Sequence, residues 1–272
     1  MRVLAINDIS CVGKCSLTAA LPIISACGAE CNVLPTALLS THTGGFEGYT
    51  YLDLTKQISA ICTHWESLGI SFDFIYSGYL GSIEQIEQVL SIRDRFLKQD
   101  GVFIVDPVMG DDGALYAGFS PEYVAKMRKL CQVADYILPN VTEACYLADL
   151  PYPLTDTSAA NAVRALQALC PHPIVTGIHT DKKVLVSYIN ETGEPTAYAS
   201  NDVPGFFCGA GDVFASAFTG ALAAGKTADE AICLASDFAA ACIRRSAKEV
   251  PDKRYGLNFE QEIFSLVKNL RG

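Results

Sequence analysis

The sequence predicts an α/β protein with a doubly wound, mostly parallel central sheet flanked by helices on both faces. Two observations predict this class. Short apolar runs alternate with longer stretches of helical periodicity. Most of the short runs are apolar at every position, which is typical of parallel strands that are covered on both faces. At 272 residues and 50% hydrophobic composition, the chain can bury one large core.

The predicted elements alternate between strand and helix along the first part of the chain. The predicted strands are Arg2–Ile6, Cys31–Leu34, Phe72–Tyr76, Val102–Val105, Tyr136–Leu138 and Ile174–Thr176. The predicted helices between them are 53–68, 82–98, 120–132 and 157–170. Because ligands of open parallel sheets bind beyond the carboxyl ends of the strands, the loops that follow these strands are the candidate site.

The pattern changes after the sixth strand. Two strands, Lys183–Ile189 and Thr196–Ser200, flank a Thr-Gly turn and predict a hairpin. Three further helices are predicted at 212–224, 227–246 and 258–270. No low-complexity linker separates these parts, so we expect a single domain over residues 1–272.

Composition excludes several classes of function. A net charge of −10 and a pI near 4.8 argue against a nucleic-acid surface or an anionic membrane as partner. No apolar run reaches membrane-spanning length, and Met1–Asn7 leads directly into a strand with no signal-peptide pattern. We therefore expect no nucleic acid and no membrane as partner, and a cytoplasmic location.

The eleven cysteines predict reduced, mostly buried thiols. Their number is odd, they are scattered among apolar neighbours, and no Cys-x-x-Cys pair occurs. The pairs Cys11/Cys15 and Cys27/Cys31 have helix-face spacing but no matching histidines, which argues against a metal site.

The segment Gly209-Ala210-Gly211-Asp212 precedes a small and apolar run that predicts a buried helix. Glycines let the backbone approach a ligand closely, and the N–H groups at a helix start bind anions. Asp212 could accept a proton from an attacking hydroxyl while the helix end stabilises a phosphoryl group. These four residues alone are also consistent with a glycine turn followed by an Asp helix cap.

Two more strand ends carry acids. Asp106-Pro-Val-Met-Gly-Asp111 places two carboxylates on one loop, which suits Mg²⁺ bound with water and phosphate oxygens; solvated acids on a Pro-Gly turn are the alternative. Pro139-Asn140-Val-Thr-Glu143 opens a helix. Glu143 could hold metal-bound water or act as an ordinary first-turn acid.

The loop Ser40–Gly45 contains His42 and Thr43 before paired glycines, which indicates a small-molecule contact or a mobile flap. A flexible surface turn is the alternative, which fits the glycines well and His42 and Thr43 less well. In Gly78-Tyr79-Leu80-Gly81, Tyr79 could stack on a flat ring or fill space.

The segment Gly13–Ser16 resembles part of a Walker A loop. It lacks Ser or Thr directly after Lys14, and Asp8 stands where that motif has glycine, so we reject a P-loop.

Together these motifs, in this order along nearly the whole chain, resemble the ribokinase-like superfamily and within it the pyridoxal (vitamin B6) kinases, especially the bacterial branch often called pyridoxamine kinases. Gly-x-Gly-Asp is common to the superfamily. The Asp-Pro-Val-Met-Gly-Asp stretch resembles the kinases for B6 and for the thiamin pyrimidine, and the loop around His42 and Thr43, with Tyr79, favours B6.

The resemblance implies a three-layer ribokinase-like fold, ATP and Mg²⁺ as cofactors, a monovalent cation such as K⁺ as a possible addition, and a homodimer. It implies Asp212 as catalytic base for the 5′-hydroxymethyl group of a B6 vitamer, with Gly209, Ala210 and Gly211 as the anion hole. The substrate-binding residues would be Asp8, His42, Thr43, Tyr79 and Asp212. The ATP-binding residues would be Asp106, Asp111, Tyr116, Asn140, Glu143, Thr176, Val203, Gly209 and Gly211, with Asp106, Asp111 and Glu143 organising the metal.

Three positions depart from the B6 pattern. Asp8 replaces a frequent Ser and is closer to the pyrimidine kinases, Leu138 replaces a Thr that often contacts phosphate, and Ala210 replaces Thr or Cys. The alternatives are therefore a hydroxymethylpyrimidine kinase of thiamin synthesis, a sugar or nucleoside kinase, and a non-catalytic binder of pyridoxal phosphate or nucleotide.

Overall fold

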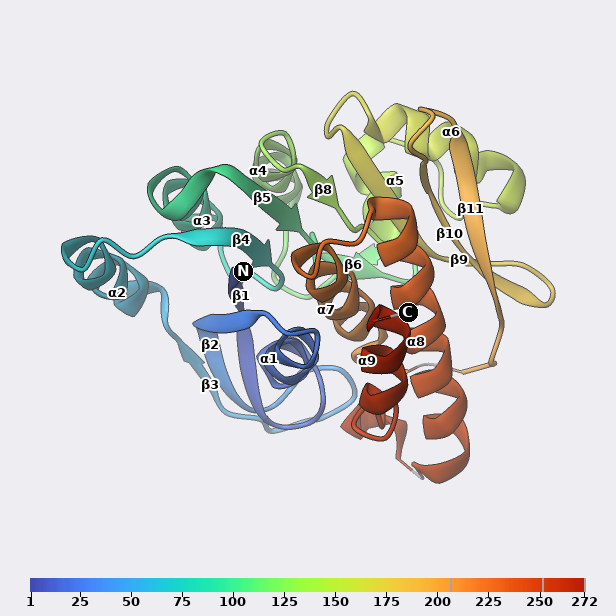
Figure 1. Cartoon of the computed structure of the whole chain (residues 1–272), viewed down its shortest axis with the longest axis horizontal. Helices are drawn as coiled ribbons and strands as arrows, with labels where there is room; N and C mark the ends of the chain where they lie inside the picture. The colour runs from blue at the N-terminus through green and yellow to red at the C-terminus, as the bar shows by residue number, and fades with distance from the viewer. Residues whose placement is uncertain (206, 251, 272) are drawn as a thin grey trace.

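A nine-stranded sheet runs through the computed structural model, which describes residues 1–205, 207–250 and 252–271 (Figure 1). Its strands are β1 (Arg2–Val12), β2 (Glu30–Thr41), β3 (Tyr51–Asp53), β4 (Phe72–Ser77), β5 (Leu97–Val105), β8 (Tyr136–Ile137), β9 (His172–His179), β10 (Lys183–Ile189) and β11 (Pro195–Asn201). The spatial order is β11-β10-β9-β8-β5-β4-β1-β2-β3. All pairs from β2 to β9 are parallel, and the antiparallel pairs lie at the two edges. The predicted mostly parallel sheet and its hairpin are confirmed.

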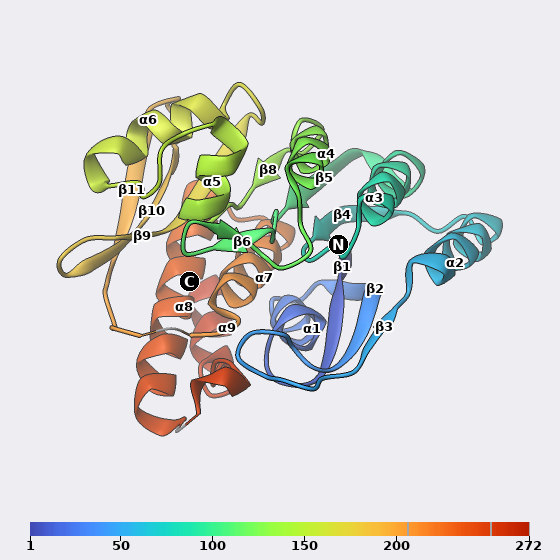
Figure 2. The ribbon, with the colours of Figure 1, turned by 180° about the vertical axis from the view of Figure 1, so that it is seen from behind.

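Helices cover both faces of this sheet (Figures 1 and 2). They are α1 (Ser16–Ala26), α2 (Thr55–Ser67), α3 (Ile83–Phe96), α4 (Pro121–Cys131), α5 (Val141–Ala148), α6 (Asp156–Leu166), α7 (Ala210–Ala223), α8 (Ala228–Glu249) and α9 (Ile263–Arg271), with a 3₁₀ turn η1 (Lys253–Tyr255). Helices α1, α7, α8 and α9 pack into one core, and α2 to α6 pack into a second. Strand β1 supplies both cores, because alternate side chains of a strand point to opposite faces: Val3 joins the first and Leu4 the second. The three-layer arrangement is confirmed.

Several helices begin at polar residues whose side chains accept the N–H of the third helical residue. Ser82, Ser120, Asn140, Thr155 and Thr227 do this for α3, α4, α5, α6 and α8. Helix α7 begins instead at Gly209, which has no side chain to supply such a cap. Its first N–H groups therefore lack the side-chain acceptor that most other helices have.

The prediction that the chain forms loops directly after Ile6 and after Leu34 is wrong in part, because both strands are longer than predicted. Strand β1 continues to Val12 and β2 to Thr41, and these two residues pair with each other; β3 then pairs with β2. Helix α1 was not predicted, because Leu17, Ala19, Ala20, Ile23 and Ile24 are all buried and the helix contains Pro22. A helix that is apolar nearly all round has no amphipathic period to detect. The last predicted helix, 258–270, begins later, at Ile263.

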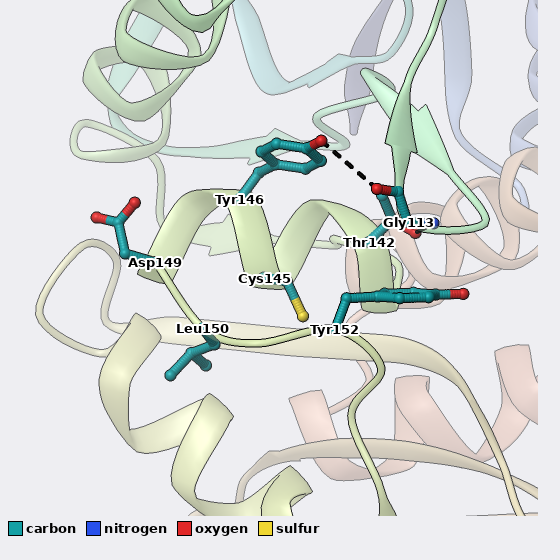
Figure 3. A pocket seen from close by; sticks show the side chains of 7 residues that line it. All are labelled: Gly113, Thr142, Cys145, Tyr146, Asp149, Leu150 and Tyr152. Carbon is teal, nitrogen blue, oxygen red and sulfur yellow. Dashed lines mark hydrogen bonds between the residues drawn. The ribbon is translucent and has the colours of Figure 1, made fainter.

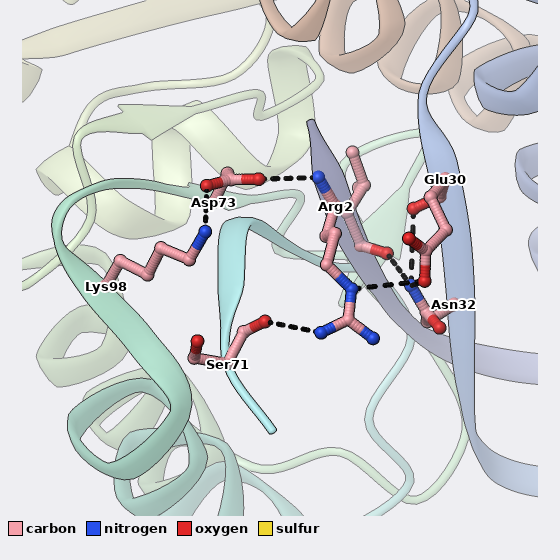
Figure 4. Close-up of polar contacts among 7 residues, drawn as sticks. Arg2, Glu30, Asn32, Ser71, Asp73 and Lys98 are labelled. Atoms are coloured by element: carbon pink, nitrogen blue, oxygen red, sulfur yellow. Dashed lines mark hydrogen bonds and ion pairs between the residues drawn. The ribbon is translucent and has the colours of Figure 1, made fainter. Parts of the chain in front are cut away.

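Ion pairs and hydrogen bonds connect the amino ends of the central strands (Figure 4). Asp73 accepts hydrogen bonds from the Arg2 backbone N–H and the Lys98 ammonium, both at 2.6 Å. The Arg2 guanidinium pairs with Glu30 at 3.1 Å, and Asn32 donates to the carbonyl of Glu30 at 3.3 Å. The Lys98 and Arg2 contacts lower the pKa of Asp73.

All eleven cysteines are free thiols, seven of them buried, as predicted. Within the described ranges, no helix combines the length and the apolar character that crossing a bilayer requires.

Candidate active site

The strand register brings the predicted loops to one level of the sheet. Ile6 on β1 pairs with Ser77 on β4, and Ser77 pairs with Val105 on β5, which pairs with Ile137 on β8. The residues that directly follow this row are Asn7, Gly78, Asp106 and Leu138. Four segments that are far apart in the sequence therefore leave the row at the same edge.

The start of α7 is open and rich in N–H donors. Gly209 has a φ of +76°, and a Cβ there would lie 2.5 Å from the carbonyl oxygen of Lys14, so only glycine fits. A Cβ on Gly211 would have no atom within 4 Å. Ala210 is the first helical residue. Together with the missing side-chain cap, this arrangement suits a bound anion.

Asp212 lies in the first turn of α7 and is half-buried. Its Oδ1 accepts a hydrogen bond from the Asn7 amide at 3.3 Å, and the backbone N–H of Ser16 also donates to the carboxylate. Burial, with a smaller contribution from the negative charge of Asp8, raises the pKa of Asp212 to about 6, against the effect of these two hydrogen bonds. The carboxylate is thus ionised at neutral pH and remains a usable base.

Asp8 lies beside this base and is 6% exposed. Its two oxygens accept hydrogen bonds from the hydroxyls of Ser16 at 2.6 Å and Ser10 at 3.2 Å. Burial raises the pKa of Asp8, and the serine hydrogen bonds oppose that shift. Asp8 and Asp212 are therefore two carboxylates of one network joined through Ser16.

Asn140 and Glu143 form a second network with the backbone of the loop that begins at Asp106. The Glu143 carboxylate accepts the N–H of Met109 at 2.9 Å and the N–H of Asn140 at 2.8 Å, and Asn140 donates to the carbonyl of Gly110 at 2.8 Å. Asn140 also caps α5 by accepting the N–H of Glu143. These bonds fix the loop after β5 against the start of α5, so both side chains have a clear structural role.

Burial raises the pKa values of Glu143 and of Asp106, which lies at the start of the same loop. Glu143 is 2% exposed and its pKa is raised to about 7, although its backbone hydrogen bonds lower it. The pKa of Asp106 is raised by burial and by the negative charges of Glu143 and Asp212. Across the described ranges, no Lys or Arg side chain forms an ion pair with any of these three carboxylates. A cation would relieve this concentration of negative charge.

The residues predicted to organise the metal, Asp106, Asp111 and Glu143, do not form a preorganised set of metal ligands. In the part of the chain that the structure describes, no group of three or more His, Cys, Asp or Glu side chains is arranged to hold a metal ion. Asp111 is exposed and accepts the N–H of Asp112, and both Glu143 oxygens already accept N–H groups. The donor set fits a water-rich Mg²⁺ that shares phosphate oxygens, which is the usual habit of this ion.

His42 is buried where four segments meet. Its Nε2 donates to the carbonyl of Arg254 at 2.5 Å, and its Nδ1 accepts the N–H of Gly44 at 3.1 Å. The Cys208 thiol lies 3.4 Å from Nε2, and Gly13 packs against the ring. Both ring nitrogens have protein partners, so the imidazole holds the loop 42–46 in place; its contact with substrate stays a prediction.

Tyr79 is half-buried, with its hydroxyl hydrogen-bonded to the Tyr51 side chain and its ring 6.1 Å from that of Phe119. Its backbone N–H donates to Asn7 Oδ1 at 2.9 Å, which ties it to the Asp212 network. Thr43 is exposed.

Of the three remaining residues predicted to bind ATP, two are hydrogen-bonded to the segments that carry Asn140 and the acidic loop, and one is not. Thr176 donates its N–H to the carbonyl of Pro139 at 2.9 Å and so lies beside Asn140. Tyr116 is 41% exposed and donates its N–H to Met109 on the acidic loop at 2.9 Å. Val203 is half-buried between β11 and α7, and no hydrogen bond joins it to either network in the described ranges.

Three residues of this edge were not predicted as site residues: Asn7, Ser16 and Tyr76. Asn7 stands directly after the predicted first strand, the same signal that identified Asp106. Ser16 was missed with helix α1. Tyr76 is fully buried on β4, has no partner for its hydroxyl, and has its pKa raised by burial and by Asp106 and Asp212.

A pocket of about 380 Å³ lies along α5, the helix whose first turn carries Glu143 (Figure 3). It is lined by Gly113, Thr142, Cys145, Tyr146, Asp149, Leu150 and Tyr152. Thr142 accepts the N–H of Gly113 at 2.9 Å across its rim. None of the predicted site residues lines it.

Comparisons with known proteins agree on the kind of protein. A family model described as phosphomethylpyrimidine kinase matches residues 13–256. A protein of Bacteroides thetaiotaomicron, provisionally named a phosphomethylpyrimidine kinase and crystallised with pyridoxal, is 36% identical with a TM-score of 0.91, covering 100% of this chain and 96% of that one. Pyridoxal kinase from Lactobacillus plantarum is 32% identical with a TM-score of 0.91, covering 98% and 96%. A provisionally named pyridoxal kinase of Schizosaccharomyces pombe is 29% identical over 238 residues, 78% of this chain and 71% of the yeast protein.

Proposed function

The chain belongs to the phosphomethylpyrimidine kinase family, and we propose that it uses ATP to phosphorylate the 5′-hydroxymethyl group of the B6 vitamers pyridoxal, pyridoxamine and pyridoxine. The Bacteroides relative crystallised with pyridoxal and the Lactobacillus pyridoxal kinase support this substrate class. The observation that carries the proposal is Asp212: a carboxylate of raised pKa beside an uncapped helix start, at the edge where the strand-end loops meet.

In the proposed reaction, Asp212 accepts the proton of the substrate hydroxyl while the hydroxyl oxygen forms a bond to the γ-phosphorus of ATP. The bond between that phosphorus and the bridging oxygen of the β-phosphate breaks, and ADP leaves. The N–H groups at Gly209, Ala210 and Gly211 stabilise the charge on the transferred phosphoryl group. Phosphoryl transfer requires little covalent chemistry from the protein, so position and charge account for most of the rate. Asp8, His42, Thr43 and Tyr79 are the proposed contacts of the pyridine ring.

Asp106, Asp111 and Glu143 are proposed to organise Mg²⁺, with Glu143 acting mainly through the loop and through bound water. Mg²⁺ would supply positive charge to the phosphates and to this acidic edge. Tyr116, Asn140, Thr176 and Val203 complete the proposed ATP site. A stimulation by K⁺ is a separate expectation, which replacing K⁺ by Na⁺ in the assay tests.

The second candidate is phosphorylation of hydroxymethylpyrimidine. The description of the matching family favours it, and so does Asp8, which is similar to the pyrimidine kinases. A sugar or nucleoside kinase is less well supported, because Asp106–Asp111 is not their usual loop. A non-catalytic binder would have no use for the base at Asp212.

An ATP-consumption assay with pyridoxal, pyridoxamine, pyridoxine and hydroxymethylpyrimidine tests the proposal. We expect kcat/KM for at least one B6 vitamer to exceed that for the pyrimidine by about tenfold or more, the discrimination that a few pocket contacts provide. A preference for hydroxymethylpyrimidine would replace the substrate, and the absence of turnover with all four would overturn the proposal.

We also propose that residues 1–272 act as one kinase domain, as a homodimer, in the cytoplasm where ATP is available. Light scattering of the purified protein tests the dimer.

A further inference from the structure

Asn7 has an unusual position among the polar residues of the active-site edge. It is 1% exposed, and its side chain joins three segments. Its Oδ1 accepts the backbone N–H groups of Asp8 at 3.0 Å and Tyr79 at 2.9 Å, while its Nδ2 donates to Asp212 at 3.3 Å. Because two backbone donors face Oδ1, the amide has only one orientation, and its N–H must face the carboxylate.

Gly78 explains how this side chain fits. A Cβ at position 78 would lie 2.2 Å from Nδ2 and 2.6 Å from Cγ of Asn7. Gly78 also donates its N–H to the carbonyl of Ile6 at 2.8 Å, which sets it directly beside β1. The first glycine of the Gly-Tyr-Leu-Gly motif thus provides the space in which the Asn7 amide lies.

We infer that Asn7 is a positioning residue for the phosphoryl-transfer step: its amide fixes the rotamer of the Asp212 carboxylate and ties it to the loop that carries Tyr79. This inference rests on the proposed function, in which Asp212 is the base. Asn7 does not itself touch the reacting atoms; it acts through Asp212. The loop that contacts the substrate ring and the base are thereby held by one side chain.

The surroundings of Asp212 make this hydrogen bond important. Six ionisable groups lie near its carboxylate. Asp8 is on β1 and Tyr76 on β4, Cys15 precedes α1, Asp106 and Tyr116 belong to the segment after β5, and Cys208 precedes α7. None of them is a cation. Asn7 and the Ser16 backbone N–H are therefore the groups that favour the ionised form, and both hydrogen bonds lower the pKa of Asp212.

The test uses the isosteric variant Asn7→Asp, with Asn7→Ala and Gly78→Ala beside it. Asn7→Asp keeps the shape and the acceptor for the two backbone N–H groups but removes the donor. We expect kcat to fall about 10- to 100-fold, as for a lost hydrogen bond to a charged group, with the KM for ATP changed by less than about threefold. The acid limb of the kcat–pH profile, expected near pH 6 in the wild type, should move upward. Gly78→Ala should lower kcat similarly by displacing the intact amide.

Asn32 on β2 provides the matched control. It is an asparagine on the neighbouring strand at the opposite end of the sheet, and it donates to the carbonyl of Glu30 (Figure 4). Asn32→Asp should leave kcat and the pH profile unchanged. If Asn7→Asp keeps the wild-type kcat, or loses kcat without any shift of the acid limb, Asn7 is only a packing residue and the inference is wrong.

A second readout separates this inference from the proposed function. In protein labelled with ¹³C-aspartate, the Asp212 carboxyl signal is identified by its loss in Asp212→Asn and is then titrated. We expect its midpoint to rise in Asn7→Asp, even if no B6 vitamer is phosphorylated. An unchanged midpoint would overturn the role of Asn7 and leave the kinase assay to decide the function.

Discussion

Aspartate residues at the two ends of the central sheet have pKa values shifted in opposite directions. At the amino ends of the strands, Asp73 accepts hydrogen bonds from Lys98 and from the Arg2 backbone, and its pKa is lowered (Figure 4). At the carboxyl ends, Asp106 is buried and Asp212 is half-buried, neither has an ion-pair partner in the described ranges, and the pKa values of both are raised. One end uses its acid for stability, whereas the other keeps its acids available for chemistry.

This difference has opposite consequences for stability. The folded-state pKa of Asp73 is below its unfolded value, so this residue stabilises the protein at neutral pH, and the contribution is lost as the pH falls toward and below its usual pKa. The folded-state pKa of Asp212 is about 6, above the ordinary aspartate value of 3.8. The folded protein therefore binds more protons between these values, and the ionised carboxylate reduces stability above pH 6.

The strongest test of this contrast is Asp212→Asn. We expect kcat to fall by roughly 10²–10⁴, the range for loss of a general base. Because a partly buried negative charge is removed, the free energy of unfolding at pH 7 should rise by about 1–2 kcal/mol. Kinetics and urea unfolding measure the two effects. Retained turnover would remove Asp212 from its role as base, and a loss of stability would contradict the electrostatic account of this end.

The next largest effects are expected at two glycines at the start of α7, Gly209 and Gly211. Their alanine variants test stability and activity separately. Gly209→Ala places a Cβ 2.5 Å from the Lys14 carbonyl at a φ of +76° and should cost about 2–4 kcal/mol of stability. Gly211→Ala meets open space, so the melting temperature should be unchanged or higher, as alanine favours helix. Its kcat/KM for ATP should still fall about tenfold or more if the anion lies there. Equal activity in Gly211→Ala and wild type would argue against that anion site.

Glu143→Gln tests whether the second acid acts through the loop. A glutamine offers only one acceptor oxygen, so its amide would face the N–H of Met109 or of Asn140. We expect a loss of about 1–3 kcal/mol in unfolding free energy, together with a raised KM for ATP. The reference is Glu122→Gln, which changes an exposed acid in the first turn of α4 and should alter neither quantity. An unchanged stability in Glu143→Gln would mean that these backbone bonds do not hold the loop.

The smallest effect is expected at the opposite end. Asp73→Asn loses the charge that Lys98 and the Arg2 N–H stabilise and should cost about 1 kcal/mol at pH 7, a loss that disappears as the pH falls below the lowered pKa of Asp73. The kcat should equal that of the wild type, because no active-site loop contacts this residue through a described hydrogen bond. A kcat reduced as in the Asp212 variant would show that the two ends are not independent.

The sequence predicted the order of most strands and helices because these elements have a clear apolar period or a wholly apolar run. It missed α1, whose buried faces leave no polar stripe, and it ended β1 at Ile6 because Asp8 and Ser10 interrupt the apolar run. Those two polar residues are buried in the strand by their bonds to one another and to Ser16, which local patterns do not reveal. At the site, the acids that follow strands were identified, whereas Asn7, which follows the first predicted strand in the same way, was overlooked.

The sequence alone determined the fold class, the glycine turn before α7 and the acids at the strand ends, because each follows from local residue chemistry and spacing. Only the tertiary structure decided how deeply each of these acids is buried and which groups donate hydrogen bonds to it. That outcome depends on contacts between residues far apart in the chain, such as Asn7 with Asp212 and Glu143 with Met109. The free energy of a charge is set by its surroundings in three dimensions, and the sheet register, rather than sequence proximity, brings those surroundings together.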